Sequence, residues 1–577
     1  MTLSPAPANF VAYWNPKITG GWKYLLPPLS ERKVLCLSAR PVALSVGQAS
    51  LYGQLTLLHD TQLQGIPRTA DPLTPVEPGN LNWRSLEDLL CHDGLLSDEQ
   101  KFDGFVLHDM EGVVLHQGNL PRIFQLLCKL PLLLRRDGFV YLGARNPHAP
   151  AQLMSRLFRR RRRAEHRLVS VRAIRDALRS AGFASTHTHA FLTWDTTLAE
   201  VIPQRGYRAS KNRENFGERL KEMLYGRVGS RWLAPAYGVV AQIGPSAVVE
   251  STLDQVAKRV AQAPPFRDGP PIIIKNYLLF PGSKAIVTLG AEGREAHDVV
   301  AVLTTDALAI ERRRVEVEVL SKLAQLPQRL ACLVPVPLDQ FVIGRTQCYL
   351  LNRLPGVTLD VESGALGHIT EQALEFVIDL HRETSTAVAV DESIYRDLFW
   401  SLVEAAESRN PAVSEELRAW DKPLRACVMG AQVPSVWMHG DYKVENIMYD
   451  QQRRRLTGVI DWELARNPGL PLLDPLYLLI YNRIIRGQTP VESVAQMIWL
   501  GQRSDVESAL LRRYLDGVGV ADSLVPALST MFIAHHIGCR LHFGANQASM
   551  ELLRNIIHET GKMLERSAEH LRKPPPE

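Results

Sequence analysis

Three side chains with oxygen donors, Asp441, Asn446 and Asp461, are spaced so that they could bind a divalent metal ion. Asp441 and Asn446 lie on a polar loop, residues 439–446, between two apolar runs. A charged turn and a second apolar strand, residues 456–460, then lead to Asp461. The two strands form a hairpin and deliver these side chains at one end. Mg²⁺ prefers a few hard oxygen ligands together with substrate phosphates. The hairpin therefore predicts a magnesium site with Asn446 and Asp461 as its protein ligands.

The composition sets outer limits on what the chain can be. Its 577 residues are too many for one hydrophobic core, so about three folding units are expected. The hydrophobic content of 46% and charged content of 22% are ordinary for a globular protein, and a net charge of +5 does not indicate a nucleic-acid partner. Seven scattered cysteines without a C-x-x-C pair argue against a disulfide framework or a zinc site and favour a reducing compartment.

No signal peptide or membrane span is predicted. The N-terminus lacks a basic segment followed by an apolar one, and the apolar run 123–134 is too short to cross a bilayer and contains Lys129. We therefore expect a soluble, cytoplasmic protein. One dense basic run, Arg156 with Arg159 to Arg163, is either a solvated surface or a contact with an anionic membrane or polyanion. The second interpretation would associate the protein peripherally with a membrane. No aromatic residues accompany the charge, so nucleic acid is not expected.

The first 245 residues alternate between short apolar runs and segments with helical spacing, which predicts a doubly wound, Rossmann-like α/β sheet. The expected strands are 33–38, 55–59, 102–108 and 138–143, and the expected helices are 83–91, 120–134 and 169–181.

Residues 30–245 resemble the class I SAM-dependent methyltransferases in the order of these features. Asp60 closes the second strand, where that family binds ribose, and the phrases LRRDGFVYLGARNP and LRSAGF resemble two later passages. The first loop of the family is glycine-rich so that backbone can approach the cofactor. Here that loop begins at Ser38, includes Pro41 and has no glycine before Gly47. The resemblance therefore implies a degenerate domain in which Asp60 and Asp109 are ordinary loop residues, and methyl transfer is not expected.

A connector, residues 246–270, ends in a cluster of prolines and glycines and marks a domain boundary. Beyond it we expect a lobe of strands with one helix at 271–355 and a helical lobe at 356–572 that contains the hairpin. The expected architecture is an α/β domain followed by an α+β bilobal domain. The strands of the first lobe are placed at 272–280, 285–289, 298–305, 333–337, 341–343 and 348–351, with a helix at 312–326. The helices of the second lobe are placed at 370–382, 393–408, 414–428, 491–500, 505–516, 523–542 and 550–571.

Residues 271 to about 570 resemble the aminoglycoside phosphotransferase and choline kinase superfamily, which has a protein-kinase-like fold. The resemblance implies that ATP and Mg²⁺ bind this region. Asp441 and Asn446 have the spacing of a kinase catalytic loop, D-x-x-x-x-N. The motifs that carry the resemblance are HGDYKVEN at 439–446, IDWE at 460–463, LLDP at 472–475 and LNRLPG at 351–356.

The resemblance also implies roles for individual residues. Asp441 would orient or deprotonate the acceptor hydroxyl, and Asn446 and Asp461 would hold Mg²⁺. Lys443 would contact the transferring phosphate, or is otherwise a surface lysine. Three neighbours have supporting roles: His439 would fix the loop, Trp462 would pack, and Glu463 would support the metal.

The nucleotide side of the site is less complete. Gly282 and Ser283, followed by Lys284, would form the tight turn over the phosphates, and the backbone from Asn352 to Leu354 would face adenine. Glu316 would pair with a lysine on the third strand.

That lysine should lie near Val302 or Leu303, and neither position is basic. Lys275 and Lys284, on the first two strands, are the cations that could replace it. The catalytic loop therefore favours an active enzyme, while the missing lysine argues against a fully conventional one.

Three functions follow from these patterns. The favoured one is an ATP- and Mg²⁺-dependent phosphotransferase acting on a hydroxyl of a small molecule, sugar or glycan-linked acceptor. The alternative is a catalytically impaired scaffold or regulator in polysaccharide or lipid assembly, and a third is a bifunctional enzyme that also transfers methyl groups. The acceptor is left open; Asp474, Tyr477, Tyr481 and Arg483 are candidates to line its pocket.

Overall fold

The computed structural model divides the chain into two compact units. One comprises Met1–Glu311 with Pro337–Arg353, and the other Arg312–Val336 with Leu354–Glu577. The strands expected for the first lobe of the bilobal domain, apart from residues 333–336, thus fall in the first unit. The structure describes residues 24–37, 53–59, 81–91, 96–107, 120–145, 149, 170–191, 199–202, 234, 236–244, 250–263, 266–267, 269–279, 284–291, 298–305, 307–358, 366–407, 411–542 and 556–562.

The first unit is built on a long sheet whose N-terminal part is parallel. Its strand order begins β3-β2-β1-β4-β5, and each neighbouring pair runs parallel. The chain therefore winds outward from β1 in both directions, as in a doubly wound sheet. These strands are β1 (Lys33–Leu37), β2 (Gln54–His59), β3 (Leu81–Ser85), β4 (Phe102–Leu107) and β5 (Leu134–Arg145). Strand β1 is buried from Val34 onward and β4 is buried throughout, because both faces of a parallel sheet are covered.

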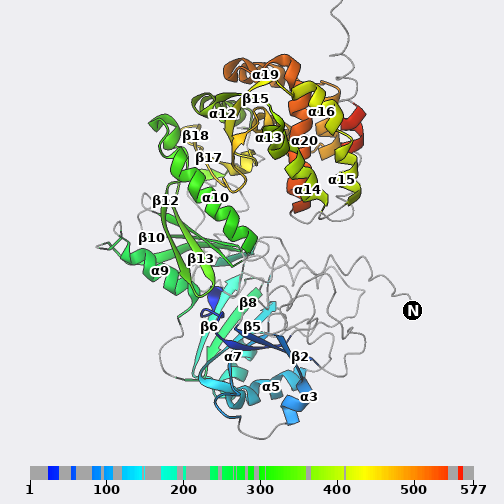
Figure 1. The fold of residues 1–577 in the computed structure, drawn as a ribbon. Helices are drawn as coiled ribbons and strands as arrows, with labels where there is room; N and C mark the ends of the chain where they lie inside the picture. Colours follow the sequence, from blue (N-terminus) through cyan, green and yellow to red (C-terminus); the bar gives the residue numbers. More distant parts are fainter. Residues whose placement is uncertain are drawn as a thin grey trace, which may run out of the picture. The chain divides into compact units, whose positions relative to one another are not determined.

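An antiparallel strand, β8 (Ala236–Gln242), follows β5 and pairs on its other side with β6 (Ser185–Phe191). Helices α5 (Leu120–Leu133) and α7 (Val171–Ser180) pack on this sheet (Figure 1). Helix α7 begins at Ser170, whose hydroxyl accepts a hydrogen bond from the backbone N–H of Ala173, so the first turn is capped.

The same sheet continues into the strands that precede the phosphotransferase-like motifs. β7 (Ala199–Ile202) pairs with β6 on one side and with β9 (Ile272–Leu279) on the other. Among the described residues this makes one sheet of thirteen strands, which ends β9-β10-β11-β13-β12. The further strands are β10 (Ala285–Ala291), β11 (Val299–Thr304), β12 (Pro337–Ile343) and β13 (Thr346–Asn352). Helix α9 (Thr252–Gln262) packs against this part of the sheet and begins with a capping box between Ser251 and Asp254.

The second unit holds the predicted hairpin. Strand β16 (Gln432–Met438) leads into the polar loop, and β17 (Ile447–Asp450) and β18 (Arg455–Val459) form the antiparallel pair. The edge of β17 is covered by the short strand β14 (Val357–Thr358). Helix α10 (Ala307–Leu323) supplies the residues from Arg312 onward, and Val319, Leu320 and Leu323 are buried on one side of it.

Helices make up most of the remaining second unit (Figure 1). They are α11 (Gln328–Ala331), α12 (Leu366–Thr384), α13 (Glu392–Tyr395), α14 (Ser401–Glu407), α15 (Pro411–Arg418), α16 (Asp421–Val428), α17 (Leu473–Ile485), α18 (Pro490–Val494), α19 (Asp505–Val518) and α20 (Val525–His542). Two short strands, β15 (Thr386–Ala389) and β19 (Arg466–Gly469), flank β16.

Some predicted elements differ from the structure. Residues 83–85 were expected to begin a helix, but they complete β3, because Leu81 to Ser85 pair with β2 along its length. Residues 333–336 were expected in a strand but form a turn and loop, and β12 begins only at Pro337. Of the helix expected at 550–571, residues 556–562 are described and helical.

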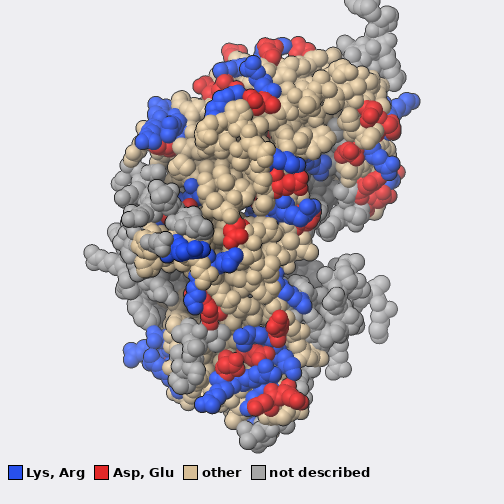
Figure 2. Space-filling view, turned by 60° about the vertical axis from the view of Figure 1, so that its left-hand side comes forward, with Lys and Arg blue, Asp and Glu red and all other residues tan. Residues whose placement is uncertain are grey.

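The structure also bears on the predictions about cysteines, membrane-spanning helices and charged surfaces. The six cysteines whose side chains are described are free. Within the described residues no single helix has the length and hydropathy of a membrane span, although α19 and the helical segment after it, bent by 113°, meet the criterion as a pair. On the face drawn in Figure 2, basic and acidic side chains are interspersed. The basic run at Arg156 and Arg159 to Arg163 lies outside the described residues.

Candidate functional site

The polar loop brings together three of the predicted site residues. Lys443 donates from Nζ to Asp441 Oδ2 over 2.8 Å, and Asn446 donates from Nδ2 to the same carboxylate oxygen over 3.1 Å and to the Asp441 backbone carbonyl over 2.9 Å. The side chains of Asp441 and Lys443 remain about one-fifth exposed. A carboxylate, an ammonium group and an amide are therefore held within hydrogen-bonding distance where solvent or a ligand reaches them.

A buried aspartate holds this loop in place by accepting two of its backbone N–H groups. Asp474, only 1% exposed, accepts the backbone N–H of His439 at 2.7 Å and that of Gly440 at 2.9 Å. It lies in the first turn of α17, where the helix dipole favours a negative charge. Gly440 has φ +85°, and a Cβ there would be 2.4 Å from the carbonyl oxygen of Leu464. Only glycine fits this turn without strain.

The hairpin places Asp461 beside the same loop. The backbone N–H of Ile460 donates to the carbonyl of Asn446 at 2.9 Å, so the two predicted metal ligands lie on adjacent, bonded segments. His439 Nε2 is 3.0 Å from the Ile460 carbonyl, which confirms its predicted structural role. Trp462 is fully buried and packs, as predicted. Asp461 has φ +68°, an unusual conformation for a residue with a side chain, of the kind that clusters at functional sites.

A buried arginine that sequence reasoning missed joins Asp461 to helix α10. Arg313 donates to a carboxylate oxygen of Glu316 through NH1, and through NH2 to Glu463 at 2.6 Å and Asp461 at 3.2 Å. Burial disfavours the charge of Arg313, but the carboxylates of Glu316, Glu463 and Asp461 outweigh it and raise the pKa of the guanidinium. The available signal was its position three residues before Glu316, which places both on one face of a helix.

Glu316 thus pairs with a cation of its own helix. Its other oxygen, Oε1, accepts the backbone N–H of Trp462 at 3.0 Å. The glutamate was expected to partner a strand lysine, and Val302 and Leu303, where that lysine would stand, are buried apolar residues of β11.

The candidates for the acceptor pocket divide into two groups. Asp474 and Arg483 have other partners: Asp474 accepts the backbone N–H of His439 in the polar loop, and Arg483 forms an ion pair with Glu507 at 2.6 Å. Tyr477 and Tyr481 stack with their ring centroids 6.0 Å apart. Lys443 Nζ lies 5.7 Å from the ring centroid of Tyr481. Tyr481 therefore lies next to Lys443, and Tyr477 stacks on Tyr481.

His535 of α20, a second residue missed by sequence reasoning, contacts the backbone of the polar loop. It is buried and interacts with the backbone of Gly440. Burial is the main cause that lowers its pKa to about 4, and the charge of Arg466 adds to the effect. The imidazole is therefore neutral at pH 7.

The neutral His535 should make stability depend on pH. Its folded pKa lies below the usual 6.5, so between those values the unfolded chain binds more protons, and acidification destabilises the fold. The shift corresponds to about 3 kcal/mol. We expect His535→Gln to reduce the loss of unfolding free energy between pH 7 and pH 4 by up to this amount, measured by urea denaturation at each pH. Parallel pH profiles for the two proteins would contradict the assignment.

Apart from Leu354, the remaining predicted residues belong to the first unit or are not described. Asn352 ends β13, and its neighbour Arg353 pairs through its side chain with Asp298, which also binds Lys275 Nζ at 2.5 Å. Lys275 is thus held by a fully buried carboxylate. Leu354 falls in the second unit and covers Gly458. Gly282 and Ser283, and the loop residues Asp60 and Asp109, lie outside the described residues.

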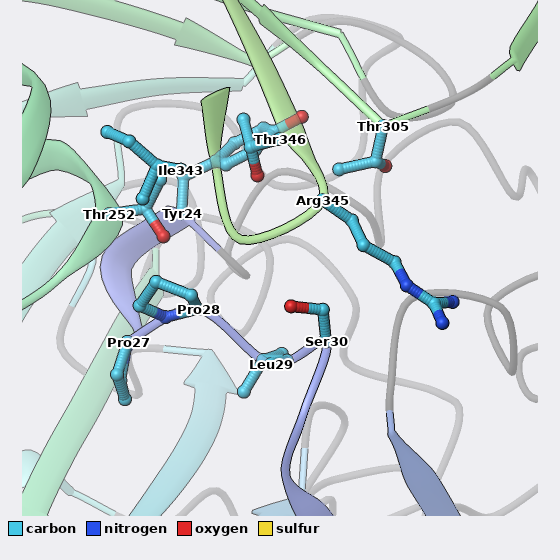
Figure 3. Close-up of a pocket in the computed structure, with 10 residues that line it drawn as sticks. All are labelled: Tyr24, Pro27, Pro28, Leu29, Ser30, Thr252, Thr305, Ile343, Arg345 and Thr346. Carbon is cyan, nitrogen blue, oxygen red and sulfur yellow. The ribbon is translucent and has the colours of Figure 1, made fainter. Parts of the chain in front are cut away.

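A small pocket, partly open to solvent, occurs in the first unit beside the β12–β13 turn (Figure 3). Its walls are mostly apolar, and its polar groups come from Ser30, Thr252, Thr305, Arg345 and Thr346. None of the residues predicted to act in phosphoryl transfer lines it. The pocket therefore does not enlarge the candidate site.

The oxygen donors fit a hard divalent cation. Among the described residues no three histidine, cysteine, aspartate or glutamate side chains form a ready metal cluster. Asn446 turns its amide nitrogen toward Asp441, which leaves its amide oxygen for another partner. The Asp461 carboxylate is 31% exposed. One amide and one carboxylate oxygen are a protein share that suits Mg²⁺ bound with phosphates.

Comparisons with known proteins find similarity to part of the chain. Residues 289–505 match the model of the phosphotransferase enzyme family. No curated protein matches the chain. A thermostable mutant of aminoglycoside phosphotransferase APH(4)-Ia, solved with ADP and hygromycin B, is 15% identical over 54% of this chain and 98% of its own, with a TM-score of 0.33.

Two further solved structures are similar to parts of the chain. A macrolide 2'-phosphotransferase from Brachybacterium faecium is 18% identical, covering 51% of this chain and 90% of its own, with a TM-score of 0.28. A SAM-dependent methyltransferase from Archaeoglobus fulgidus is 13% identical, covering 41% of this chain and 90% of its own, with a TM-score of 0.23. Residues 289–505 therefore match the phosphotransferase enzyme family, and the polar loop and the hairpin lie inside the matched segment.

Proposed function

We propose that this domain transfers the terminal phosphoryl group of ATP to a hydroxyl of a small-molecule, sugar or glycan-linked acceptor. The observation that carries the proposal is the contact of Asp441 with both Lys443 and Asn446 on a loop held by buried Asp474. Phosphoryl transfer requires mainly positioning and electrostatic stabilisation. A rigid loop that presents a base, a cation and a metal-binding amide together meets this requirement.

Each residue has a distinct role in this proposal. Asp441 accepts the proton of the acceptor hydroxyl and orients its oxygen toward the phosphorus. Lys443, 2.8 Å from that carboxylate, neutralises charge on the transferring phosphoryl group. Asn446 and Asp461 would hold Mg²⁺, which when bound offsets the negative charge of the phosphates. The nucleotide-binding roles given to Gly282, Ser283, Lys284, Asn352 and Leu354 stay predictions from the sequence.

The N-terminal part supports a separate proposal about architecture. We infer a methyltransferase-like domain that lacks methyl transfer, because its parallel strands wind outward from β1 while the sequence after that strand has no early glycine. The anionic contact of the arginine run and the cytoplasmic location also remain proposals.

Nucleotide titration tests the proposed reaction. We expect the purified full chain to bind ADP more tightly with Mg²⁺ than without it by isothermal titration calorimetry. Asp461→Asn should weaken MgADP binding by about 10-fold or more, since a metal ligand is lost, and leave metal-free ADP binding unchanged. Asp516→Asn, an exposed position on α19, is the matched control. A wild-type chain that binds neither ADP nor MgADP would refute the proposed function and favour the scaffold alternative.

A further inference from the structure

One cation in the second unit is shared by three carboxylates. The side chain of Arg313 is only 4% exposed, and those of Glu316, Glu463 and Asp461 are 3%, 17% and 31% exposed. Without the guanidinium, three negative groups would face one another with little solvent to screen them. The guanidinium therefore offsets the mutual repulsion of these carboxylates.

The geometry of this contact requires an arginine specifically. A guanidinium carries five N–H donors in a planar fork, so it can bond several carboxylates at fixed angles, whereas an ammonium group acts as a single point charge. NH1 faces Glu316, and NH2 faces both Glu463 and Asp461. The fork thus sets where helix α10 stands relative to the end of β18.

The contact with Glu316 also reaches the backbone next to Asp461. Glu316 uses one oxygen for Arg313 and the other for the N–H of Trp462, the residue after Asp461. Asp461 is consequently held twice, through its own carboxylate and through the following peptide. Its positive φ shows a backbone that needs such support.

Resting on the proposed function, we propose that Arg313 is the positioning cation of the phosphotransferase site. It replaces, from helix α10, the strand lysine that is missing at Val302 and Leu303, and it orients Asp461 for the metal. The competing interpretation is that Arg313 occupies Asp461 and keeps a metal away from it. The two interpretations predict opposite effects when the charge is removed.

The test compares Arg313→Gln, Arg313→Lys and, as the control on the exposed side of the same helix, Arg314→Gln. We expect Arg313→Gln to weaken MgADP binding by about 10- to 100-fold, the usual effect of losing a partner that orients a metal ligand. Arg313→Lys should recover part of this loss because it keeps the charge. Unchanged or tighter MgADP binding by Arg313→Gln would overturn the proposal, and tighter binding would support the competing interpretation.

Hydrogen exchange measures the positioning role without any nucleotide. Mass spectrometry of a peptide that contains Trp462 should show about tenfold faster exchange in Arg313→Gln than in wild type or Arg314→Gln. Should Arg313→Gln fail to fold, the double variant Arg313→Gln/Glu316→Gln replaces the buried ion pair with two amides and should fold, yet still bind MgADP weakly. Wild-type exchange at Trp462 in these variants would overturn the proposal. If the wild type binds no MgADP, the proposed function fails, and the exchange result alone decides whether Arg313 positions Asp461.

Discussion

Asp441→Asn should lower kcat by about 10²- to 10⁴-fold, the usual contribution of a positioned general base. The amide has nearly the shape of the carboxylate but cannot take a proton from the acceptor hydroxyl. The bond from Asn446 to the Asp441 backbone carbonyl does not involve the replaced group, so the loop should keep its shape. MgADP binding should therefore stay within about twofold of wild type, because only the transition state loses an interaction.

The measurement combines two assays on the same preparations. ADP release, coupled to an enzymatic readout, gives kcat with whichever alcohol acceptor yields the highest wild-type turnover. Calorimetry gives the affinity for MgADP. Asp516→Asn, on the exposed side of α19, should match wild type in both. Turnover of Asp441→Asn within fivefold of wild type would show that another group takes the proton.

Asp474→Ala should cost about 3–5 kcal/mol in the free energy of unfolding, the range for breaking a buried charged contact. Alanine would leave the backbone N–H groups of His439 and Gly440 without their acceptor in the interior. His381 Nε2, 3.4 Å from Asp474 Oδ2, would also lose its neighbour. Urea denaturation followed by tryptophan fluorescence measures the change, with Asp516→Ala as the exposed control. A loss below about 1 kcal/mol would show that the loop does not depend on this carboxylate.

The effect of Asp474 should also depend on pH. Burial favours the neutral acid, but His381 and the His439 backbone outweigh it, and the pKa of Asp474 lies below its usual value. A depressed pKa stabilises the fold above the unfolded-state pKa, near about 3.9, and this stabilisation is lost as the pH falls through the folded value. The difference between wild type and Asp474→Ala should therefore be constant at neutral pH and shrink only in strong acid.

Local features of the chain were predictable because their partners are close in sequence. Asp441, Lys443 and Asn446 occur within one loop, so their spacing alone indicated that they would meet. The largely apolar segments of β1 and β4 were also enough to predict central strands, since a strand that is buried on both faces needs apolar residues on both. Residues 83–85 were assigned wrongly because their helical spacing competes with pairing to β2, which is a tertiary contact.

The sequence by itself determined which groups lie together: a carboxylate, a lysine and two further oxygen donors around one hairpin. Only the tertiary structure decided what holds them. Arg313 and Asp461 are 148 residues apart, and Asp474 reaches back 35 residues to the His439 N–H. Such contacts depend on how helices pack against the loop, and no local periodicity encodes that packing. A buried carboxylate such as that of Glu316 needs a cation close to it, but the cation can come from any part of the chain. This is why Glu316 can be paired although the strand lysine is missing. Helix α10 supplies that cation.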